Sequence, residues 1–164
     1  MCGKEVAGIA AAEPSLYRGQ TFVLTPLART SQEALALGRA LVKAVGARPL
    51  LLEPQRHDQL VATASHLPYL LACALVGTAE QRAEADTTVW DVVASGFRDT
   101  SRLAASDVTM MLDILLTNRE AVLDTLDTYQ LEIRVFADML RAGDEQGLKE
   151  VLRAIQMRRK ELFT

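Results

Sequence analysis

The feature that most constrains this chain is a long run from Leu60 to Ala79 that contains no Asp, Glu, Lys or Arg. The run is about as long as the roughly 20 residues that a helix needs to cross a bilayer. It also carries hydroxyl groups, a histidine and a proline, which a membrane span would place in hydrocarbon. The run therefore predicts a buried helix of a soluble protein, and we expect no membrane partner.

This helix is expected to run from about Pro54 to Ala83, with Pro68 inside it. Proline lacks a backbone N–H, and its ring crowds the carbonyl of the residue four positions earlier, here Ala64. We therefore expect a kink or a break at this point of the helix.

The first 53 residues differ from the rest. A strand signal at Thr21–Leu24 precedes a capping box at Thr30–Glu33, which opens a helix that stops at Gly46, and a second strand signal follows at Pro49–Leu52. The apolar face of that helix comprises Leu35, Leu41, Val42 and Val45. Two strands do not form a stable parallel sheet alone. This segment is expected to be the end of a larger α/β domain whose front is not in the sequence.

After Pro54 the pattern is helical to the end. A short helix is expected from Thr87 to Ala94, broken by the residues around Gly96. Asp99 and Asp107 are each placed to cap a further helix, the second ending near Leu116. We thus expect a mainly α chain, with a helical domain of about six helices after a short β-α-β segment.

The longest helix opens with a second capping box at Thr117–Glu120 and ends at Gly143, and Asp144 caps the last helix. Its apolar residues are spaced as a heptad seam: Val122, Leu126, Tyr129, Ile133, Phe136 and Leu140. The last helix has a stripe of its own: Leu148, Val151, Leu152, Ile155 and Leu162. Two interpretations are open for the seam, a homodimer interface or an intrachain core.

Composition narrows the function. Apolar residues make up 49% of the chain, charged residues 24%, and the net charge is −3. An acidic balance argues against a nucleic-acid partner. The two cysteines, Cys2 and Cys73, are interpreted as free thiols of a reducing compartment. The first residues show no apolar core of a signal peptide, and we expect a cytoplasmic protein.

Several chemistries have no motif in these 164 residues. There is no Gly-rich dinucleotide loop of the form G-x-G-x-x-G and no P-loop. The only histidines, His57 and His66, have no cysteine near them in the sequence. We therefore expect no metal site.

One polar cluster lies inside the apolar helix. His57 and Asp58 are followed by Ser65, His66 and Tyr69, and a regular helix would bring Asp58, Ser65 and Tyr69 to one stripe with His66 beside it. Two interpretations remain open, a binding site or a core histidine that has simply found a partner.

A second cluster is Ser95-Gly-Phe-Arg-Asp-Thr-Ser-Arg102. Two arginines beside the first amides of a helix capped by Asp99 form a plausible carboxylate site. The alternative is a helix cap with an ion pair between Asp99 and Arg102.

The chain resembles the prephenate dehydrogenase family from Met1 to about Leu162. Four segments carry the resemblance in this order: MCGKEVAGI, LYRGQTFVLTP, HDQLVATASHLPYLLACAL and GFRDTSRLAASD. The SHLP and GFRDTSR blocks are its most specific parts. In that family a nucleotide-binding Rossmann domain precedes a helical dimerisation domain, and the substrate lies between them. The resemblance implies a boundary near residue 53, with residues 1–53 ending the first domain and 54–164 forming the second.

The resemblance also implies site residues. Arg102 matches the arginine that binds a substrate carboxylate, and Asp99 matches its acidic partner. From the SHLP block come Ser65 and His66, and Tyr69 stands where some members carry another histidine. Glu5 matches a gating glutamate, Lys4 stands where Thr or Ser is usual, and Met111 stands where many members have Trp. The family's catalytic histidine falls upstream of Met1, so no catalytic residue is expected here.

Family resemblance implies a chemistry as well. The full enzyme oxidatively decarboxylates prephenate to 4-hydroxyphenylpyruvate, or arogenate to tyrosine, with NAD or NADP. The substrate is a small dicarboxylate, and the enzyme is a homodimer of tyrosine biosynthesis. This chain alone is expected to be inactive and to bind no cofactor by itself. The alternative is a stand-alone helical module for dimerisation or aromatic-acid binding, without catalysis.

Overall fold

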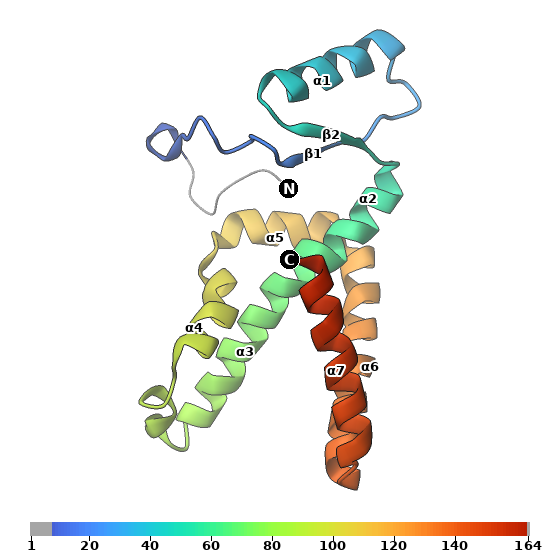
Figure 1. The fold of residues 1–164 in the computed structure, drawn as a ribbon. Helices are drawn as coiled ribbons and strands as arrows, with labels where there is room; N and C mark the ends of the chain where they lie inside the picture. Colours follow the sequence, from blue (N-terminus) through green and yellow to red (C-terminus); the bar gives the residue numbers. More distant parts are fainter. Residues whose placement is uncertain (1–7, 164) are drawn as a thin grey trace. The chain divides into compact units, whose positions relative to one another are not determined.

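The computed structural model describes residues 8–163 and divides into two compact units, the first reaching Val122 and the second beginning at Leu123. Helices dominate both units, and a two-stranded parallel sheet lies near the start of the chain (Figure 1). The predicted fold class is therefore confirmed.

The short sheet and its helix have the predicted strand–helix–strand order. Strand β1 (Thr21–Leu24) pairs in parallel with β2 (Arg48–Leu51), so that Leu24 lies opposite Leu51. Helix α1 (Gln32–Ala44) connects the two strands and lies against them. Gly38 allows the close approach, because a Cβ atom there would lie 3.7 Å from a methyl carbon of Leu24.

The start of α1 was predicted with a one-residue error. Ser31, and not Thr30, is the N-cap, and its hydroxyl accepts from the Ala34 N–H at 3.1 Å. The Thr30 hydroxyl instead accepts from the Leu27 N–H in the preceding turn. At the other end Gly46 adopts a φ of 78°, which confirms it as the residue that stops the helix.

The predicted apolar face of α1 is only partly covered. Val42 is buried and Leu35 is half-buried, but Leu41 is 60% exposed and Val45 is exposed as well. Two strands are too narrow to cover the whole face of a helix of this length. Leu41 and Val45 therefore stay exposed within the described residues.

One continuous helix runs from Pro54 to Ala83, as predicted. It comprises α2 (Pro54–Val61), a π-helical turn (Ala62–His66) and α3 (Leu67–Ala83). Its first turn is capped by Glu53, whose carboxylate accepts from the N–H groups of Gln55 and Arg56.

The expected disturbance at Pro68 takes the form of the π turn. The N–H of Leu67 bonds to the carbonyl of Ala62, five residues back instead of four. This wider turn lies immediately before Pro68, where the chain has no N–H to continue the regular ladder. The helix thus accommodates the proline without a break.

The helix is long and apolar enough to cross a membrane by length and composition alone, and it is the one helix among the described residues that is. Only 17% of its most apolar window is buried in this structure. The buried positions are Ala62, His66, Ala72 and Ala79. The helix that the sequence predicted to be buried is therefore only partly covered within the described residues.

The segment after α3 differs from the prediction. A short 3-10 turn (Thr87–Trp90) replaces the helix expected from Thr87 to Ala94. Helix α4 (Ser95–Ser101) begins at the residues predicted to break, and a 3-10 turn (Arg102–Ala105) follows it. Asp99 lies inside α4 and caps nothing. These turns and α4 pack along α3, and Trp90 meets Phe97 edge-on at 6.2 Å.

Helix α5 (Val108–Thr117) has the predicted cap, since the Asp107 carboxylate accepts from the Met110 N–H at 2.7 Å. Helix α6 (Arg119–Ala142) follows after a single residue, Asn118. The second capping box is wrong: the Thr117 hydroxyl donates back to the carbonyls of Asp113 and Ile114, so it belongs to the end of α5.

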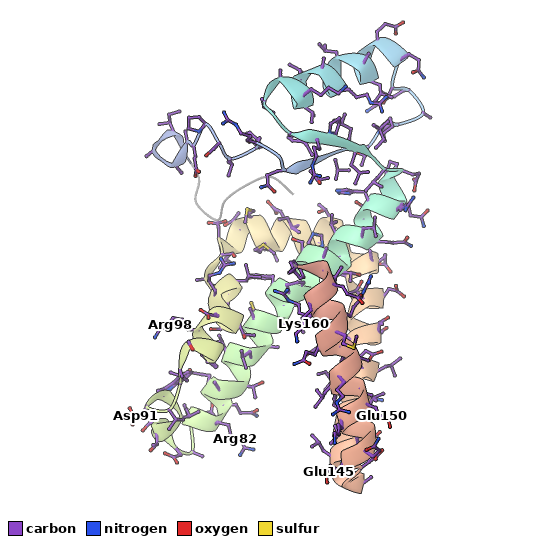
Figure 2. All side chains as sticks on the ribbon, in the orientation of Figure 1. Arg82, Asp91, Arg98, Glu145, Glu150 and Lys160 are labelled. Carbon is purple, nitrogen blue, oxygen red and sulfur yellow. The ribbon has the colours of Figure 1, made fainter. Side chains whose placement is uncertain are left out.

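The second unit contains most of α6 and all of α7 (Glu145–Leu162), with α7 running back alongside α6 (Figure 1). Gly143, at a φ of 66°, ends α6, and Asp144 caps α7 by accepting from the Gly147 N–H. Both ends are as predicted. The charged side chains of α7 project to solvent, among them Glu145, Glu150 and Lys160 (Figure 2).

Both predicted stripes remain partly open to solvent. In the α6 seam Val122 is buried, but Ile133 is 48% exposed and Leu140 is 67% exposed. On α7 more than half of each of Leu152, Ile155 and Leu162 is exposed. Within one copy the seam is therefore buried at its start and only partly covered beyond it.

The hydrophobic core of the described residues is small. Its buried members are mostly alanines: Val42, Ala47, Ala62, Ala72, Ala79, Met111 and Val122. Many large apolar side chains stay exposed on α1, α5, α6 and α7. This much exposed apolar surface is typical of a surface that another polypeptide covers.

The cap of α5 gives a stability prediction. Replacement Asp107→Ala removes the acceptor of the Met110 N–H and should lower the free energy of unfolding by about 1 kcal/mol. Urea unfolding at one fixed protein concentration measures the change. The control is Asp113→Ala, an exposed position of the same helix, with an expected change within about 0.5 kcal/mol. Equal losses in the two variants would contradict the capping role.

Candidate functional site

The best-defined polar site of the first unit is built around His66, the last residue of the π turn. His66 is 6% exposed, and it is the one buried polar or charged residue among the described residues. The π turn adds about one residue to a helical turn, so side chains beyond it shift around the axis. The predicted stripe assumed a regular α-helix, and it is therefore wrong beyond Ala62: His66, not Ser65, shares a face with the Asp58 carbonyl.

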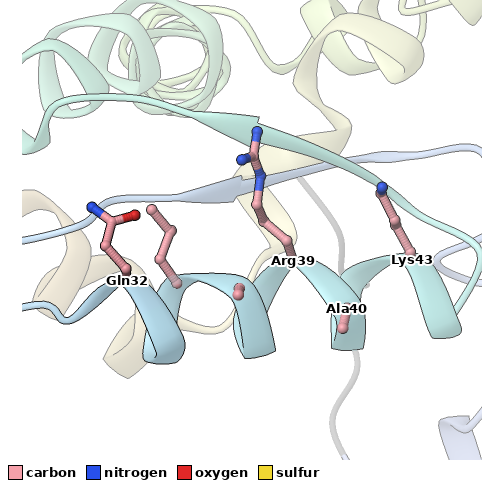
Figure 3. Close-up of a pocket in the computed structure, with 6 residues that line it drawn as sticks. Gln32, Arg39, Ala40 and Lys43 are labelled. Carbon is pink, nitrogen blue, oxygen red and sulfur yellow. The ribbon is translucent and has the colours of Figure 1, made fainter.

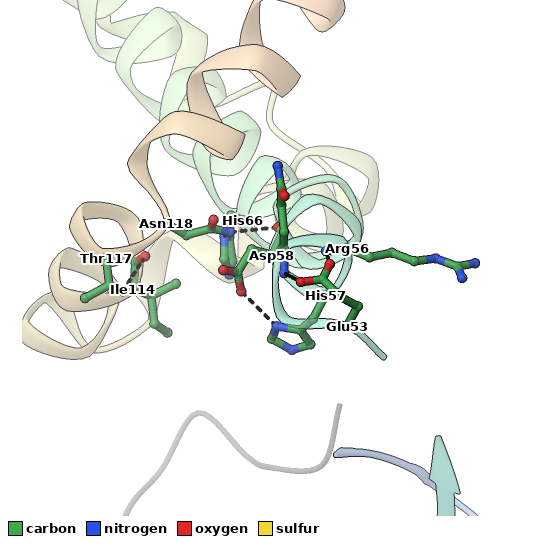
Figure 4. Close-up of polar contacts among 9 residues, drawn as sticks. Glu53, Arg56, His57, Asp58, His66, Ile114, Thr117 and Asn118 are labelled. Carbon is green, nitrogen blue, oxygen red and sulfur yellow. Dashed lines mark hydrogen bonds and ion pairs between the residues drawn. The ribbon is translucent and has the colours of Figure 1, made fainter. Parts of the chain in front are cut away.

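Asn118 holds this arrangement together (Figure 4). Its side-chain nitrogen lies 2.8 Å from the main-chain oxygen of Asp58 and 3.2 Å from Nδ1 of His66. One amide thus joins the junction of α5 and α6 to both sides of the π turn. Sequence reasoning missed Asn118, because its partners lie 60 and 52 residues earlier. The only sequence signal was a lone Asn between two helical segments.

The electrostatics favour a neutral ring at His66. Burial lowers the pKa of His66 most, the nearby carboxylate of Asp58 raises it, and His57 lowers it again. The net direction is below the ordinary histidine value. Next to it, Nδ1 of the partly exposed His57 lies 2.9 Å from the exposed carboxylate of Asp58 (Figure 4). Asp58 is thus engaged by His57, and the charges of both residues act on the His66 ring.

Tyr69 and Ser65 lie on either side of this buried ring in the sequence, and both are half-buried. A hydrogen bond with the Cys73 thiol, one turn along α3, raises the pKa of Tyr69, and burial and the Cys73 charge act in the same direction. The phenol is therefore neutral and is held along its own helix. The roles of Ser65 and Tyr69 in binding stay predictions.

Arg102 begins the 3-10 turn that packs against α3, the helix that continues from His66. Among the ion pairs of residues 8–163 there is none between Arg102 and Asp99. Because α4 starts at Ser95, its first amides do not lie beside Asp99 and Arg102, and that part of the predicted carboxylate site is wrong. Glu5 lies outside the described residues. The binding roles of Arg102, Asp99 and Glu5 stay predictions.

A groove along α1 is separate from this cluster (Figure 3). It is lined by Gln32, Leu35, Ala36, Arg39, Ala40 and Lys43. All six residues come from one helix, and none of them is a predicted site residue. Among the described residues no three His, Cys, Asp or Glu side chains gather as metal ligands.

Family models match almost the entire chain. The nucleotide-binding domain of prephenate dehydrogenase matches residues 1–51, and the dimerization domain of prephenate dehydrogenase matches residues 53–154. The chain belongs to the prephenate dehydrogenase family. The resemblance carried by the SHLP and GFRDTSR blocks is thus confirmed, and the two matches meet close to the predicted domain boundary.

Among curated relatives, prephenate dehydrogenase of Bacillus subtilis is 31% identical over 148 residues, which cover 90% of this chain and 40% of that protein. Cyclohexadienyl dehydrogenase of Zymomonas mobilis is 30% identical over 165 residues, covering 100% of this chain and 56% of that protein. This member of the prephenate dehydrogenase family therefore spans about half the length of these relatives.

Solved structures agree. Prephenate dehydrogenase of Aquifex aeolicus in complex with hydroxyphenyl propionate and NAD+ has a TM-score of 0.92 and 29% identity, over 98% of this chain and 56% of that one. Synechocystis arogenate dehydrogenase has a TM-score of 0.85 and 28% identity, over 98% and 59%. The fold of the described helices is thus the family fold.

The depressed pKa of His66 predicts a pH effect on stability. Below about pH 6.5 His66 becomes protonated in the unfolded chain but stays neutral in the folded chain. The free energy of unfolding therefore falls as the pH drops from about 6.5 toward the pKa of His66 in the folded chain. Replacement His66→Gln should remove this part of the slope, measured as the urea midpoint against pH. The control His57→Gln, at a partly exposed ring, should retain it. An unchanged slope in His66→Gln would contradict the assignment.

Proposed function

We propose that this chain is the substrate-binding and dimerising part of a dehydrogenase that oxidatively decarboxylates prephenate or arogenate with NAD or NADP. Family membership across both matched regions carries the proposal. The similarity to an enzyme whose structure contains hydroxyphenyl propionate and NAD+ supports an aromatic acid as ligand. Residues 1–53 end the nucleotide-binding domain in this proposal, and residues 54–164 form the helical domain.

In this proposal Arg102 grips a substrate carboxylate. A guanidinium can offer two parallel N–H groups to one carboxylate, a geometry that the ammonium of lysine does not reproduce. Asp99, His66, Ser65, Tyr69 and Glu5 complete the binding set. The contact between α3 and the turn that begins at Arg102 supports this grouping, because it joins the helix after His66 to the arginine segment.

The nicotinamide cofactor serves as the hydride acceptor when it is bound. The loop between β1 and α1, Thr25–Ser31, contains no glycine whose amide would approach a pyrophosphate closely. The donor set of the described sheet therefore does not fit a dinucleotide. We propose that this chain alone binds no NAD or NADP.

We further propose a homodimer formed through the helical domain. The open apolar side chains of α6 and α7 support it, because they leave the predicted seam and stripe without a cover in one copy. The matched dimerization domain supports it as well. Stable obligate dimers bury on the order of 2,000 Å² or more, mostly apolar surface.

A reducing, cytoplasmic location fits this proposal, because Cys73 is a free thiol on α3. A soluble state fits it too. The apolar helix carries a buried histidine with an amide partner, and such a pair is costly at the centre of a lone membrane span. No nucleic-acid partner is proposed, given the net charge of −3.

The first test concerns Arg102. In a polypeptide where these residues follow a complete nucleotide-binding domain, Arg102→Lys should raise KM about ten- to a hundred-fold with little change in kcat, since the lost grip acts on ground and transition states alike. Steady-state kinetics with prephenate and arogenate, each with NAD and NADP, measure this and identify the substrate pair. Arg98→Lys, on the neighbouring helix α4, is the control and should leave KM unchanged. An unchanged KM in Arg102→Lys would sink the assignment.

A second test uses this chain alone. It should produce no NADH or NADPH from either substrate, because these 164 residues hold no Gly-rich cofactor loop and no catalytic histidine of the family. Spectrophotometry at 340 nm measures turnover. Steady production by the purified chain would overturn the expectation, whereas binding of hydroxyphenyl propionate without turnover would support a binding module.

A third test concerns the dimer. The chain should sediment at twice its mass of 17.9 kDa at micromolar concentration. Leu152→Glu places a charge on the open stripe of α7 and should shift the equilibrium toward monomer. Met157→Glu adds the same charge to the same helix at an exposed position on the face opposite the stripe, and should remain dimeric. A stable monomer of the unchanged chain would contradict the proposal.

A further inference from the structure

The orientation of the Asn118 amide can be assigned from its partners. The main-chain oxygen of Asp58 can only accept a hydrogen bond, and it lies 2.8 Å from the amide nitrogen. If the amide were turned over, two oxygens would face each other at that distance. The nitrogen, with its two hydrogens, therefore faces Asp58 and His66.

This orientation decides the proton on the histidine. The amide nitrogen has no acceptor capacity, and Nδ1 of His66 lies 3.2 Å from it. Nδ1 must therefore accept, and a neutral imidazole that accepts at one nitrogen donates at the other. We propose that Asn118 is a positioning residue that fixes His66 as the Nε2–H tautomer, an uncharged hydrogen-bond donor for an oxygen of the bound acid.

The surroundings of the ring agree with this assignment. Burial keeps the pKa of His66 below its usual value, so the ring is neutral near pH 7, while the charge of Asp58 acts in the opposite direction and His57 adds to the lowering. The π turn supports the ring position, because the Leu67 N–H is bonded to Ala62 and the turn ends at His66.

Nε2 is the ring nitrogen of His66 that has no hydrogen-bond partner among residues 8–163. Among residues 8–163 the His66 ring makes hydrogen bonds only through Nδ1. No buried side-chain nitrogen or oxygen of these residues lacks a hydrogen-bond partner. Nε2 therefore keeps access to solvent in a ring that is otherwise buried. A donor held at a fixed angle, without a charge that would need its own counter-ion, suits a carboxylate or carbonyl oxygen. Held in this tautomer, the ring is not a proton acceptor.

The tautomer of His66 can be tested in this chain alone, whereas the assignment of a ligand oxygen to Nε2 rests on the proposed function. The two parts are tested apart. Long-range proton–nitrogen correlation spectra of the nitrogen-15-labelled chain distinguish the tautomers directly, and the chain has only two histidines to assign. His57→Gln identifies the remaining signal as His66.

At about one pH unit above the ordinary histidine pKa of about 6.5, His66 should show a protonated Nε2 and an unprotonated Nδ1. Asn118→Asp replaces the donor by an acceptor, so the proton should move to Nδ1 and the pKa of His66 should rise by about one to three pH units. Asn118→Ala removes the partner and should give a mixture of both tautomers.

The matched control is Asp58→Asn. It retains the main-chain carbonyl that orients Asn118, so the tautomer should stay the same, and it removes the carboxylate that favours protonation, so the pKa of His66 should fall. An Nδ1–H tautomer in the unchanged chain would overturn the assignment. An unchanged tautomer in both folded Asn118 variants would do so too, and circular dichroism checks their folding.

The ligand arm uses hydroxyphenyl propionate as the probe. Its addition should shift the Nε2–H proton signal of His66, and Asn118→Asp should weaken binding about ten-fold or more, as expected for one lost charge-assisted bond. If the tautomer is as assigned but the probe neither binds nor shifts this signal, the donor role and the proposed ligand class fail while the positioning of the ring by Asn118 stands.

Discussion

Pro68 has no N–H to give, and its ring excludes the carbonyl that a regular α-helix would place beside it. In this chain that constraint falls in the middle of a helix of 30 residues. The backbone responds with a π turn from Ala62 to His66, which keeps the helix continuous and leaves a buried histidine at its end. The position of the site depends on this turn.

Asn118 links the π turn to the junction of α5 and α6. Its amide bonds on one side to the carbonyl of Asp58, before the turn, and on the other to His66, at its end. A buried polar ring without a partner would cost roughly 1–3 kcal/mol. The junction between α5 and α6 thus supplies a hydrogen-bond partner for a ring that lies buried at the end of the π turn.

Several helices of this chain leave large apolar side chains exposed. Helices α1, α6 and α7 each bury part of an apolar face and leave the rest open, because the described elements are too few to cover them. For α6 and α7 the matched dimerization domain favours a second copy as the cover. For α1 the matched nucleotide-binding domain favours the rest of a larger sheet. These open faces consist of helix positions that were visible as sequence periodicity.

Local signals determined much of the fold. The caps at Asp107 and Asp144 and the stops at Gly46 and Gly143 were predicted correctly, because each acts within one turn of its own helix. Wrong caps arose where neighbouring residues compete. The N-cap of α1 is Ser31, one position after the predicted Thr30. The Thr117 hydroxyl donates to a carbonyl of α5, and Asp99 lies inside a helix that begins four residues earlier.

By itself the sequence determined the helical class, the β-α-β start, the family and the grouping of His57 and Asp58 with His66, since all of these lie in periodicity, capping residues and short motifs. Only the tertiary structure decided which of those polar residues is buried and what holds it. The π turn shifted the helix face, and the partner of His66 came from 52 residues away. A single sequence carries no signal for such a pairing, because the contact depends on where two helices meet in space and not on spacing along the chain.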